Sequence, residues 1–109
     1  MKLQREDSMT VREISVEDVA MGSGPPLLDV RSPAEYAQGH VPGARNVPLE
    51  QVRAQPHRFT DQPVRTICAS GRRSYTAAQA ISAAGGQAES VAGGTRAWVE
   101  SGRPVEQGH

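Results

Sequence analysis

Residues 68–74 read Cys-Ala-Ser-Gly-Arg-Arg-Ser, and this segment joins two stretches of different character. Before it, Val64–Ile67 has the β-branched residues of a strand and is apolar enough at its ends to be buried. After it, small apolar residues at positions 77, 80, 81 and 84 recur with helical spacing, which predicts a helix over residues 75–84. The sequence therefore predicts a strand, a tight polar loop and a helix in direct succession.

The cysteine in this loop is predicted to be reactive. The first backbone N–H groups of a helix have no partner within the helix and favour an anion. Ser70 and Gly71 permit a tight turn in which several N–H groups converge, and Arg72 and Arg73 add positive charge. Such surroundings lower the pKa of a cysteine from about 8.5 to roughly 3.5–7.5. We interpret Cys68 as a nucleophilic thiolate, with a buried structural cysteine as the alternative.

Length and charge limit the classes of function. The chain has 109 residues, and we expect one domain over residues 1–109 with a loose leader at 1–9 and a polar tail at 105–109. Its 12 basic and 12 acidic residues give a formal net charge of zero, whereas nucleic-acid binding requires a basic face. Aromatic residues make up 4% of the chain, which disfavours base stacking. We therefore expect no nucleic acid among its partners.

The single cysteine excludes an intramolecular disulfide, and the three scattered histidines argue against a metal site. A free thiol fits a reducing compartment, so we expect a cytoplasmic protein. The first ten residues lack the apolar core of a secretory signal, and no run reaches the length of a membrane span. These features predict no membrane partner and no metal or organic cofactor, and a monomer is the default expectation.

Strands and helices are expected to alternate along the chain, which predicts a parallel sheet with helices on both faces. Strands are predicted at residues 11–14, 27–31, 45–47, 64–68 and 88–92. Three helices are predicted from their N-cap residues: one from Ser15, with Asp18 in the capping box, to Gly22; one from Ser32, with Glu35, to Gly39; and one from Thr95 to Glu100. Two more are predicted at residues 49–54 and 75–84, and a polar loop is predicted at residues 55–63.

Two of these strands end in polar residues. Asp29 and Arg31 close the second strand, and Cys68 closes the fourth. In open parallel sheets, ligands bind beyond the carboxyl ends of the strands. We therefore expect the two ends to lie at one edge of the sheet and to form a single site.

Four segments, in this order, make the chain resemble the single-domain form of the rhodanese (thiosulfate sulfurtransferase) family. They are residues 28–36 (Leu-Asp-Val-Arg-Ser-Pro-Ala-Glu-Tyr), residues 39–44 (Gly-His-Val-Pro-Gly-Ala), residues 68–74, and Gly93-Gly94 followed by Trp98. The resemblance implies a rhodanese-like α/β fold with a five-stranded, mainly parallel sheet and helices on both faces. It also implies that Cys68 forms a covalent persulfide as the reaction intermediate.

The same resemblance implies a sulfurtransferase. The Cys68 thiolate would attack the sulfane sulfur of an anionic donor such as thiosulfate, with sulfite as the leaving group. Cyanide, a small thiol or a protein thiol would then accept the sulfur. The loop amides would hold the donor's negative oxygens or the terminal sulfur. The substrate-binding residues expected here are Ala69, Ser70, Gly71, Arg72, Arg73 and Ser74.

The charged residues around the loop are expected to have different roles. Arg72 is expected to face the entrance and attract the donor. Arg73 either joins Arg72 there or turns inward to pair with Asp29, and we favour the inward pair. We interpret Asp29 as a structural acceptor rather than a catalytic acid. Arg31 and Glu35 are predicted to form a local ion pair, with substrate steering by Arg31 as the alternative.

His40 is the candidate for a general base paired with the thiol, but we interpret it as an ordinary turn residue. A loop that already lowers the thiol pKa needs no base. His57 and His109 are expected to be solvated, and Trp98 is expected to pack in the core. Ala69 leaves the mouth of the loop open, which suits a bulky acceptor.

Other classes of function stay open at this point. Related dual-specificity phosphatases use a Cys-x5-Arg loop, which requires arginine at position 74, where this chain has Ser74. A loop one residue shorter suits a sulfur atom better than a tetrahedral phosphate, which argues against phosphatase or arsenate reductase chemistry. A rhodanese-like module that binds a partner without catalysis is the second rival. A sulfur carrier that delivers persulfide sulfur to a partner protein shares the chemistry and is not separated from an enzyme by sequence.

Overall fold

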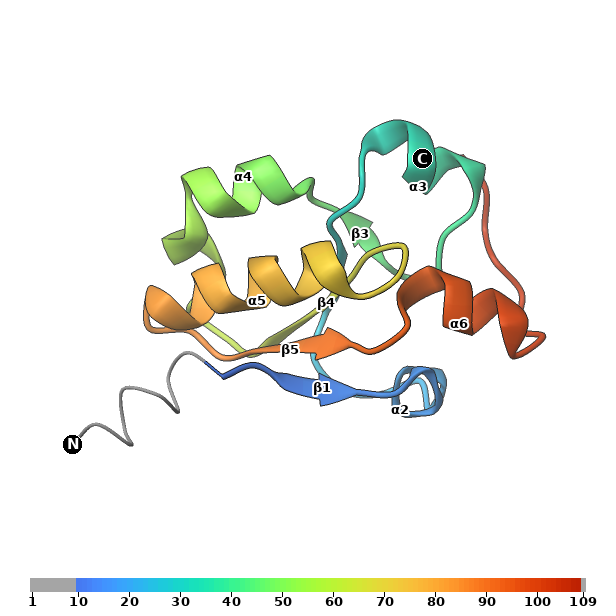
Figure 1. Ribbon diagram of the computed structural model, residues 1–109, viewed down its shortest axis with the longest axis horizontal. Helices are drawn as coiled ribbons and strands as arrows, with labels where there is room; N and C mark the ends of the chain where they lie inside the picture. Colours follow the sequence, from blue (N-terminus) through green and yellow to red (C-terminus); the bar gives the residue numbers. More distant parts are fainter. Residues whose placement is uncertain (1–9, 109) are drawn as a thin grey trace.

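The computed structural model describes residues 10–108, so the expected leader and His109 lie outside the described residues. Within this range, five strands form one sheet in the order β1-β5-β4-β2-β3 (Figure 1). All four pairings between neighbouring strands are parallel, which confirms the predicted α/β architecture. The strands are β1 (Arg12–Ile14), β2 (Leu27–Asp29), β3 (Arg45–Asn46), β4 (Val64–Ile67) and β5 (Ala88–Val91).

Helices cover both faces of this sheet, as Figure 1 shows. Helices α4 (Leu49–Ala54) and α5 (Arg72–Ala83) pack on one face. Helices α2 (Val16–Ala20), α3 (Pro33–Gln38) and α6 (Gly94–Glu100) bury side chains on the other. A short 3-10 helix, η1 (Pro56–Phe59), follows α4.

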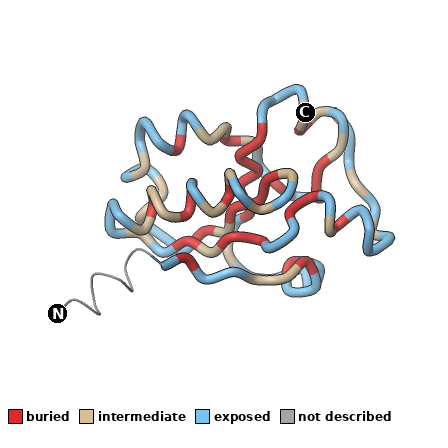
Figure 2. The backbone as a smooth tube through the Cα atoms, viewed as in Figure 1, coloured by how far each residue is buried: buried red, intermediate tan, exposed pale blue. Residues whose placement is uncertain are grey.

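The core consists of two apolar clusters, one on each face of the sheet. Neighbouring residues of a strand point to opposite faces. Accordingly, Leu28 belongs to the cluster that contains Val52 of α4 and Ile81 of α5. Leu27 belongs to the cluster that contains Trp98 of α6. Figure 2 shows the buried residues following the strands and the inner sides of the helices.

Helix α5 begins at Arg72, earlier than the predicted start at residue 75. The prediction was wrong at this end because Gly71 adopts a left-handed backbone (φ 112°) and leads directly into the helix. Arg72, Arg73 and Ser74 therefore form the first helical turn rather than a loop. Since Gly71 has no side chain to cap the helix, the first amides of α5 are left for another acceptor.

Several strand and helix ends differ from the predictions by a single residue, and three larger differences have a physical reason. The N-cap of α6 is Gly93 (φ 76°) rather than Thr95, because the glycine turn itself starts the helix. The predicted polar loop at 55–63 contains η1, which has Pro56 in its first turn. Strand β2 ends at Asp29 rather than at Arg31, whose backbone N–H turns back to the Asp29 carboxylate.

The two predicted capping boxes are confirmed. Ser15 accepts a hydrogen bond from the N–H of Asp18, and Ser32 accepts one from the N–H of Glu35, both at 3.2 Å. The two carboxylates accept hydrogen bonds from the serine N–H groups at 3.1 and 3.0 Å. The second box holds the Glu35 carboxylate at the start of α3.

The carboxyl ends of β2 and β4 lie side by side, because these strands are neighbours and pair Asp29 with Ile67. Cys68 follows Ile67 directly. The prediction that both polar strand ends share one edge of the sheet is therefore confirmed.

Candidate active site

Cys68 lies at this edge with its sulfur enclosed by the loop and the start of α5. The residue is only 1% exposed. The Gly71 N–H donates to the sulfur at 3.1 Å, and the Ser74 Oγ lies 3.4 Å from it. A buried thiol that accepts a backbone hydrogen bond and contacts a hydroxyl differs from an inert core cysteine, whose neighbours are apolar.

Helix α6 holds the loop in this shape. The N–H groups of Thr95 and Arg96 donate to the carbonyl oxygens of Cys68 and Ala69 at 2.8 and 3.0 Å. These bonds hold the two loop carbonyls toward the start of α6. In Figure 1 the segment between β4 and α5 lies beside the start of α6.

Only glycine fits at the point where α6 meets the loop. A Cβ atom at Gly94 (φ 58°) would lie 2.7 Å from the Ala69 carbonyl oxygen and would also collide with that of Cys68. The Gly93-Gly94 pair therefore allows the close approach between the helix start and the loop backbone. This gives a physical reason for two glycines at this place in the sequence.

Opposing effects set the pKa of Cys68. Burial raises the pKa of this thiol, because it disfavours the charged form. Hydrogen bonds from the Ser74 hydroxyl and from the N–H groups of Ser74, Gly71 and Ser70 act in the other direction. Their sum lowers the pKa of Cys68 below its ordinary value, which favours the thiolate.

The predicted pair between Arg73 and Asp29 is wrong, because Arg73 instead binds Glu35. Its Nη1 and Nη2 atoms donate to the two Glu35 carboxylate oxygens at 2.8 and 2.9 Å. The Arg73 hydrogen bonds are the main cause that lowers the pKa of Glu35 to about 2; burial raises it, and Ser32 lowers it further. The pair ties the first turn of α5 to the first turn of α3.

The predicted pair between Arg31 and Glu35 is also wrong, because Arg31 binds Asp29. The Arg31 Nε donates to Asp29 Oδ1 at 3.0 Å and its Nη2 to Oδ2 at 2.8 Å. Both residues are buried, at 7% and 0% exposure. This confirms Asp29 as a structural acceptor, and it explains why Asp29 is not free to bind Arg73. The Arg31 Nη2 also donates to the Gly39 carbonyl, at 2.8 Å.

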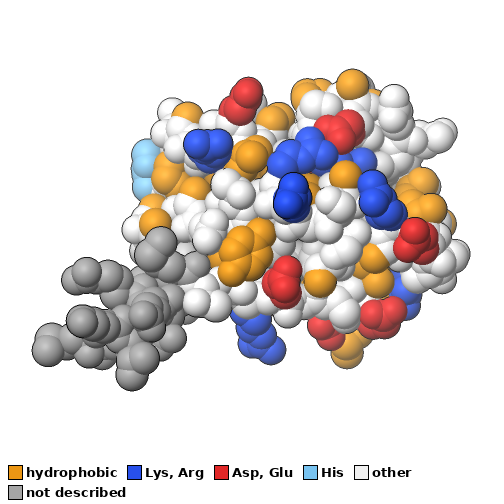
Figure 3. Space-filling view, in the orientation of Figure 1, with side chains coloured by type: hydrophobic (Ala, Val, Ile, Leu, Met, Phe, Trp, Pro, Cys, Tyr) orange, Lys and Arg blue, Asp and Glu red, His pale blue; other side chains and the backbone are white. Residues whose placement is uncertain are grey.

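The other predicted loop residues lie closer to solvent. Ser70 and Arg72 are exposed and Ala69 is half-buried. None of the ion pairs within residues 10–108 involves Arg72. Figure 3 shows arginine side chains gathered on the face that carries the start of α5. The expected entrance role of Arg72 fits this position and stays a prediction.

Sequence reasoning missed the buried hydroxyls behind the loop. Ser90 of β5 is fully buried, and its Oγ lies 2.8 Å from the Ser74 Oγ. Thr66 of β4, also fully buried, donates to the Ser74 carbonyl at 2.8 Å. Both could have been found from the sequence, because each is a polar residue inside a strand that is predicted to be buried. Asn46 was missed as well; its amide donates to the backbone carbonyls of Asp29 and Arg31.

His40 has structural contacts, which supports its interpretation as a turn residue rather than a base. Its Nδ1 donates to the Tyr36 carbonyl at 2.7 Å, and its ring stacks on Tyr36 with 3.6 Å between centroids. Its backbone exchanges hydrogen bonds with Glu106. His57 is exposed and Trp98 is buried, as predicted.

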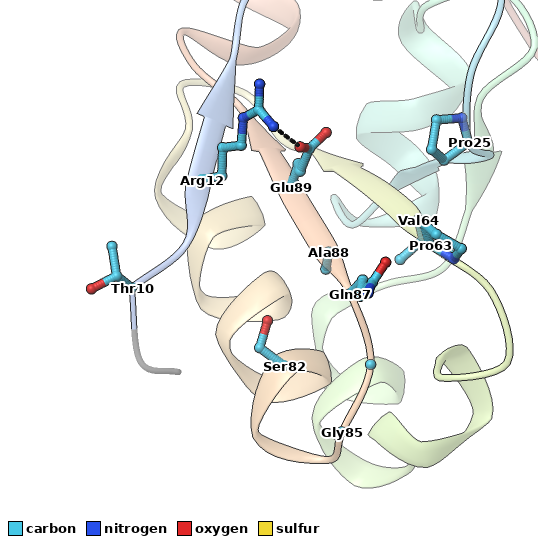
Figure 4. Close-up of a pocket in the computed structure, with 11 residues that line it drawn as sticks. Thr10, Arg12, Pro25, Pro63, Val64, Ser82, Gly85, Gln87, Ala88 and Glu89 are labelled. Atoms are coloured by element: carbon cyan, nitrogen blue, oxygen red, sulfur yellow. Dashed lines mark ion pairs between the residues drawn. The ribbon is translucent and has the colours of Figure 1, made fainter. Parts of the chain in front are cut away.

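A hollow at the opposite end of the strands is separate from this site. It has a volume of about 530 Å³ and lies beside the starts of β1, β4 and β5 (Figure 4). Its charged side chains, Arg12 and Glu89, pair with each other at 3.4 Å. Cys68 is not among its lining residues.

Within residues 10–108, no three His, Cys, Asp or Glu side chains are grouped as metal ligands. In the same range, no helix has the length and hydropathy needed to cross a bilayer.

Comparison with known proteins agrees with this fold. A family model described as a rhodanese-like domain matches residues 15–101. The chain is 35% identical over 104 residues to a protein named sulfurtransferase from Allochromatium vinosum, covering 91% of this chain and 89% of that protein. It is 45% identical over 56 residues to the uncharacterized protein YqhL of Bacillus subtilis, but this covers 50% of this chain and only 44% of that protein.

The crystal structure of a rhodanese-related protein from Thermoplasma volcanium has a TM-score of 0.78 to this structure at 32% identity, covering 86% of this chain and 96% of that one. This chain is therefore a member of the rhodanese-like domain family. The resemblance drawn from its motifs is confirmed.

Proposed function

We propose that this protein is a sulfurtransferase that carries sulfur as a persulfide on Cys68. The donor is a small anion with a sulfane sulfur, such as thiosulfate, and the acceptor is cyanide or a thiol. The observation that carries the proposal is the convergence of the Gly71 N–H and the Ser74 hydroxyl on the buried Cys68 sulfur. The name of the Allochromatium vinosum relative supports the same class of reaction.

Two displacements at sulfur complete the cycle. The Cys68 thiolate forms a bond to the sulfane sulfur. The sulfur–sulfur bond of thiosulfate breaks, and sulfite leaves with the bonding electron pair. A cyanide ion or a thiolate then attacks the outer sulfur of the persulfide. The bond between the two persulfide sulfurs breaks, and Cys68 returns as the thiolate. Neither step needs an external oxidant or reductant.

The loop supports these steps through electrostatics. The amides of Ser70, Gly71 and Ser74, which favour the thiolate, also stabilise a negative outer sulfur near the same place. Arg72, exposed at the start of α5, would attract the anionic donor. The Arg73–Glu35 pair holds the helix start in position, so Arg73 is a supporting residue in this proposal.

Intact mass measurement tests the proposal directly. Incubation with thiosulfate should add the mass of one sulfur, roughly 32 Da, to the wild-type protein and nothing to Cys68→Ser. Later addition of cyanide should remove that mass and release thiocyanate. A thiol that alkylates readily but gains no sulfur would overturn the thiosulfate donor, and hydrolysis of an aryl phosphate would indicate phosphatase chemistry instead. A thiol that neither alkylates nor gains sulfur would indicate a binding module.

We also propose that the protein works in a reducing, cytoplasmic setting, because a persulfide on Cys68 requires a free thiol. A monomer is the default proposal for its oligomeric state. Thiol labelling in intact cells and size-exclusion chromatography test these two statements.

A further inference from the structure

A second buried hydroxyl lies behind the one that contacts Cys68. Ser90 of β5 is 0% exposed, and its Oγ lies 2.8 Å from the Ser74 Oγ. Within residues 10–108, Ser74 is the one side-chain partner of Ser90. Ser74 Oγ thus stands between two groups, the Ser90 hydroxyl and the Cys68 sulfur at 3.4 Å. The side chains of Ser90, Ser74 and Cys68 thus form a hydrogen-bonded row that runs from β5 through the first turn of α5 to the sulfur.

The number of protons in this hydrogen-bonded row of side chains indicates which charge state of Cys68 it favours. With Cys68 as a thiol, the three side chains have three polar protons but only two hydrogen bonds between them. One proton is then left without an acceptor within the row, in a buried place. When Cys68 is a thiolate, two protons serve two contacts. Ser90 then donates to Ser74, and Ser74 donates to the sulfur. The arrangement is complete only when the sulfur carries the negative charge.

The charge on the sulfur sets the direction of these hydrogen bonds. Between the two serine hydroxyls either oxygen can donate, and Cys68 as a thiol donates to the Ser74 Oγ. A thiolate can only accept, so Ser74 then donates to the sulfur and Ser90 donates to Ser74. A hydroxyl that donates to a charged sulfur makes a stronger bond than one that donates to a neutral thiol. Donation from Ser90 polarises Ser74 and strengthens that bond further.

We propose that Ser90 is a positioning residue that directs the Ser74 hydroxyl onto the Cys68 sulfur and keeps the nucleophile ready for sulfur transfer. The proposal relies on the proposed function only in taking Cys68 as the nucleophile. Ser90 touches neither donor nor acceptor. It acts through Ser74.

The charges around Cys68 do not involve Ser90. Charged side chains on Ser90's own strand and on the neighbouring elements include Glu89 of β5, Arg65 of β4, Arg12 and Glu13 of β1, Arg72 and Arg73 of α5, Glu35 of α3, Asp29 of β2 with Arg31 after it, and Arg96 and Glu100 of α6. None of them has a hydrogen bond or ion pair with the Ser90 side chain. A change at Ser90 therefore leaves every charge in place and alters only the hydrogen-bonded row.

The rate of Cys68 alkylation by iodoacetamide as a function of pH tests this inference without any sulfur donor. Ser90→Ala should raise the midpoint of the pH profile by about half a unit or more. Ser90→Thr, which keeps a hydroxyl, should restore a midpoint near that of wild type. Ile81→Val, a buried change in α5 outside the row, should lower the melting temperature and leave the midpoint unchanged.

A double-mutant cycle shows whether Ser90 acts through Ser74. In the Ser74→Ala background, Ser90→Ala should cause no further shift of the midpoint. An unchanged midpoint in Ser90→Ala, or an equal shift in both backgrounds, would overturn the proposal. Because alkylation and persulfide formation are separate measurements, the midpoint shift is informative even if thiosulfate proves to be the wrong donor. Ser90→Ala removes a single oxygen atom, and its melting temperature confirms that the assayed protein is folded.

Discussion

At the scale of single residues, the buried pair of Asp29 and Arg31 organises the edge of the sheet beside Cys68. Asp29 is fully buried, and a carboxylate there is tolerated because Arg31 donates three side-chain hydrogen bonds to it. The same guanidinium donates to the Gly39 carbonyl and so fastens the segment after β2 to the end of α3. The pair therefore has a structural role.

Arg31→Ala should therefore cost far more stability than loss of an exposed pair. It leaves Asp29 as a buried charge without its cation, and the free energy of unfolding should fall by about 3–5 kcal/mol. Arg12→Ala is the matched control, because it breaks the Arg12–Glu89 pair, in which Arg12 is 79% exposed, and it should cost no more than about 1 kcal/mol. Urea denaturation followed by Trp98 fluorescence measures both. Equal losses would contradict the importance given to burial.

At the scale of elements, the start of α6 determines the shape of the loop that carries Cys68. Its first amides bind the carbonyls of Cys68 and Ala69, and the glycine turn before it lets the two backbones approach. The start of α5 lacks a capping side chain, so its amides serve the sulfur instead. Two helix starts thus act on one loop, one from the carbonyl side and one from the amide side.

Gly94→Ala tests the role of this contact. Gly102 is the matched control, because it also has a positive φ (86° against 58°) but no atom within 4 Å of an added Cβ. Gly102→Ala should cost about 1–2 kcal/mol from backbone strain alone. Gly94→Ala adds a collision with the loop carbonyls, so it should cost more than the control by at least about 1 kcal/mol and slow the alkylation of Cys68 at neutral pH. If the two variants lose equal stability and Cys68 alkylates normally in both, the contact does not shape the loop.

At the scale of the whole molecule, the site is assembled from segments that lie far apart in the sequence. The Arg73–Glu35 pair joins α5 to α3 across 38 positions of the sequence. The C-terminal segment returns to the same region, where Glu106 exchanges backbone hydrogen bonds with His40. The structure around Cys68 at this edge of the sheet therefore depends on contacts between the two halves of the chain.

The stability of the folded protein should depend on pH through Glu35. Because its pKa in the folded state is about 2, below the usual value of 4.5, the unfolded chain binds more protons between these values. The stabilisation is complete above about pH 4.5 and is lost as pH falls toward 2. It should amount to about 1 kcal/mol or less, since both side chains are more than a third exposed (38% and 37%).

Urea denaturation at about pH 6 and about pH 3 checks this expectation. Glu35→Gln should show a smaller loss of stability between the two pH values than wild type does. Glu50→Gln, which changes an exposed carboxylate in the first turn of α4, is the control and should keep the wild-type difference. If both variants respond to pH in the same way, Glu35 is not the group that titrates.

Sequence alone determined the alternation of strands and helices, both capping boxes, and the position of the single cysteine between a strand and a helix. These features depend on neighbours within a few residues, whose spacing and side-chain chemistry are written in the chain. The rhodanese-like family was also visible from four short segments. The early start of α5 was missed because a left-handed glycine followed by arginines has no distinct helical pattern.

Only the tertiary structure decided which charges pair and which hydroxyls meet. Arg73 and Asp29 were both near the site in the predicted sheet. Arg31, two residues after Asp29, occupies the Asp29 carboxylate, and Arg73 binds Glu35 instead. Ser90 and Ser74 meet because β5 lies next to β4, and no local pattern in the chain encodes that adjacency. The physical reason is general: backbone preferences act locally, whereas partners in a buried polar network are chosen by the packing of distant elements.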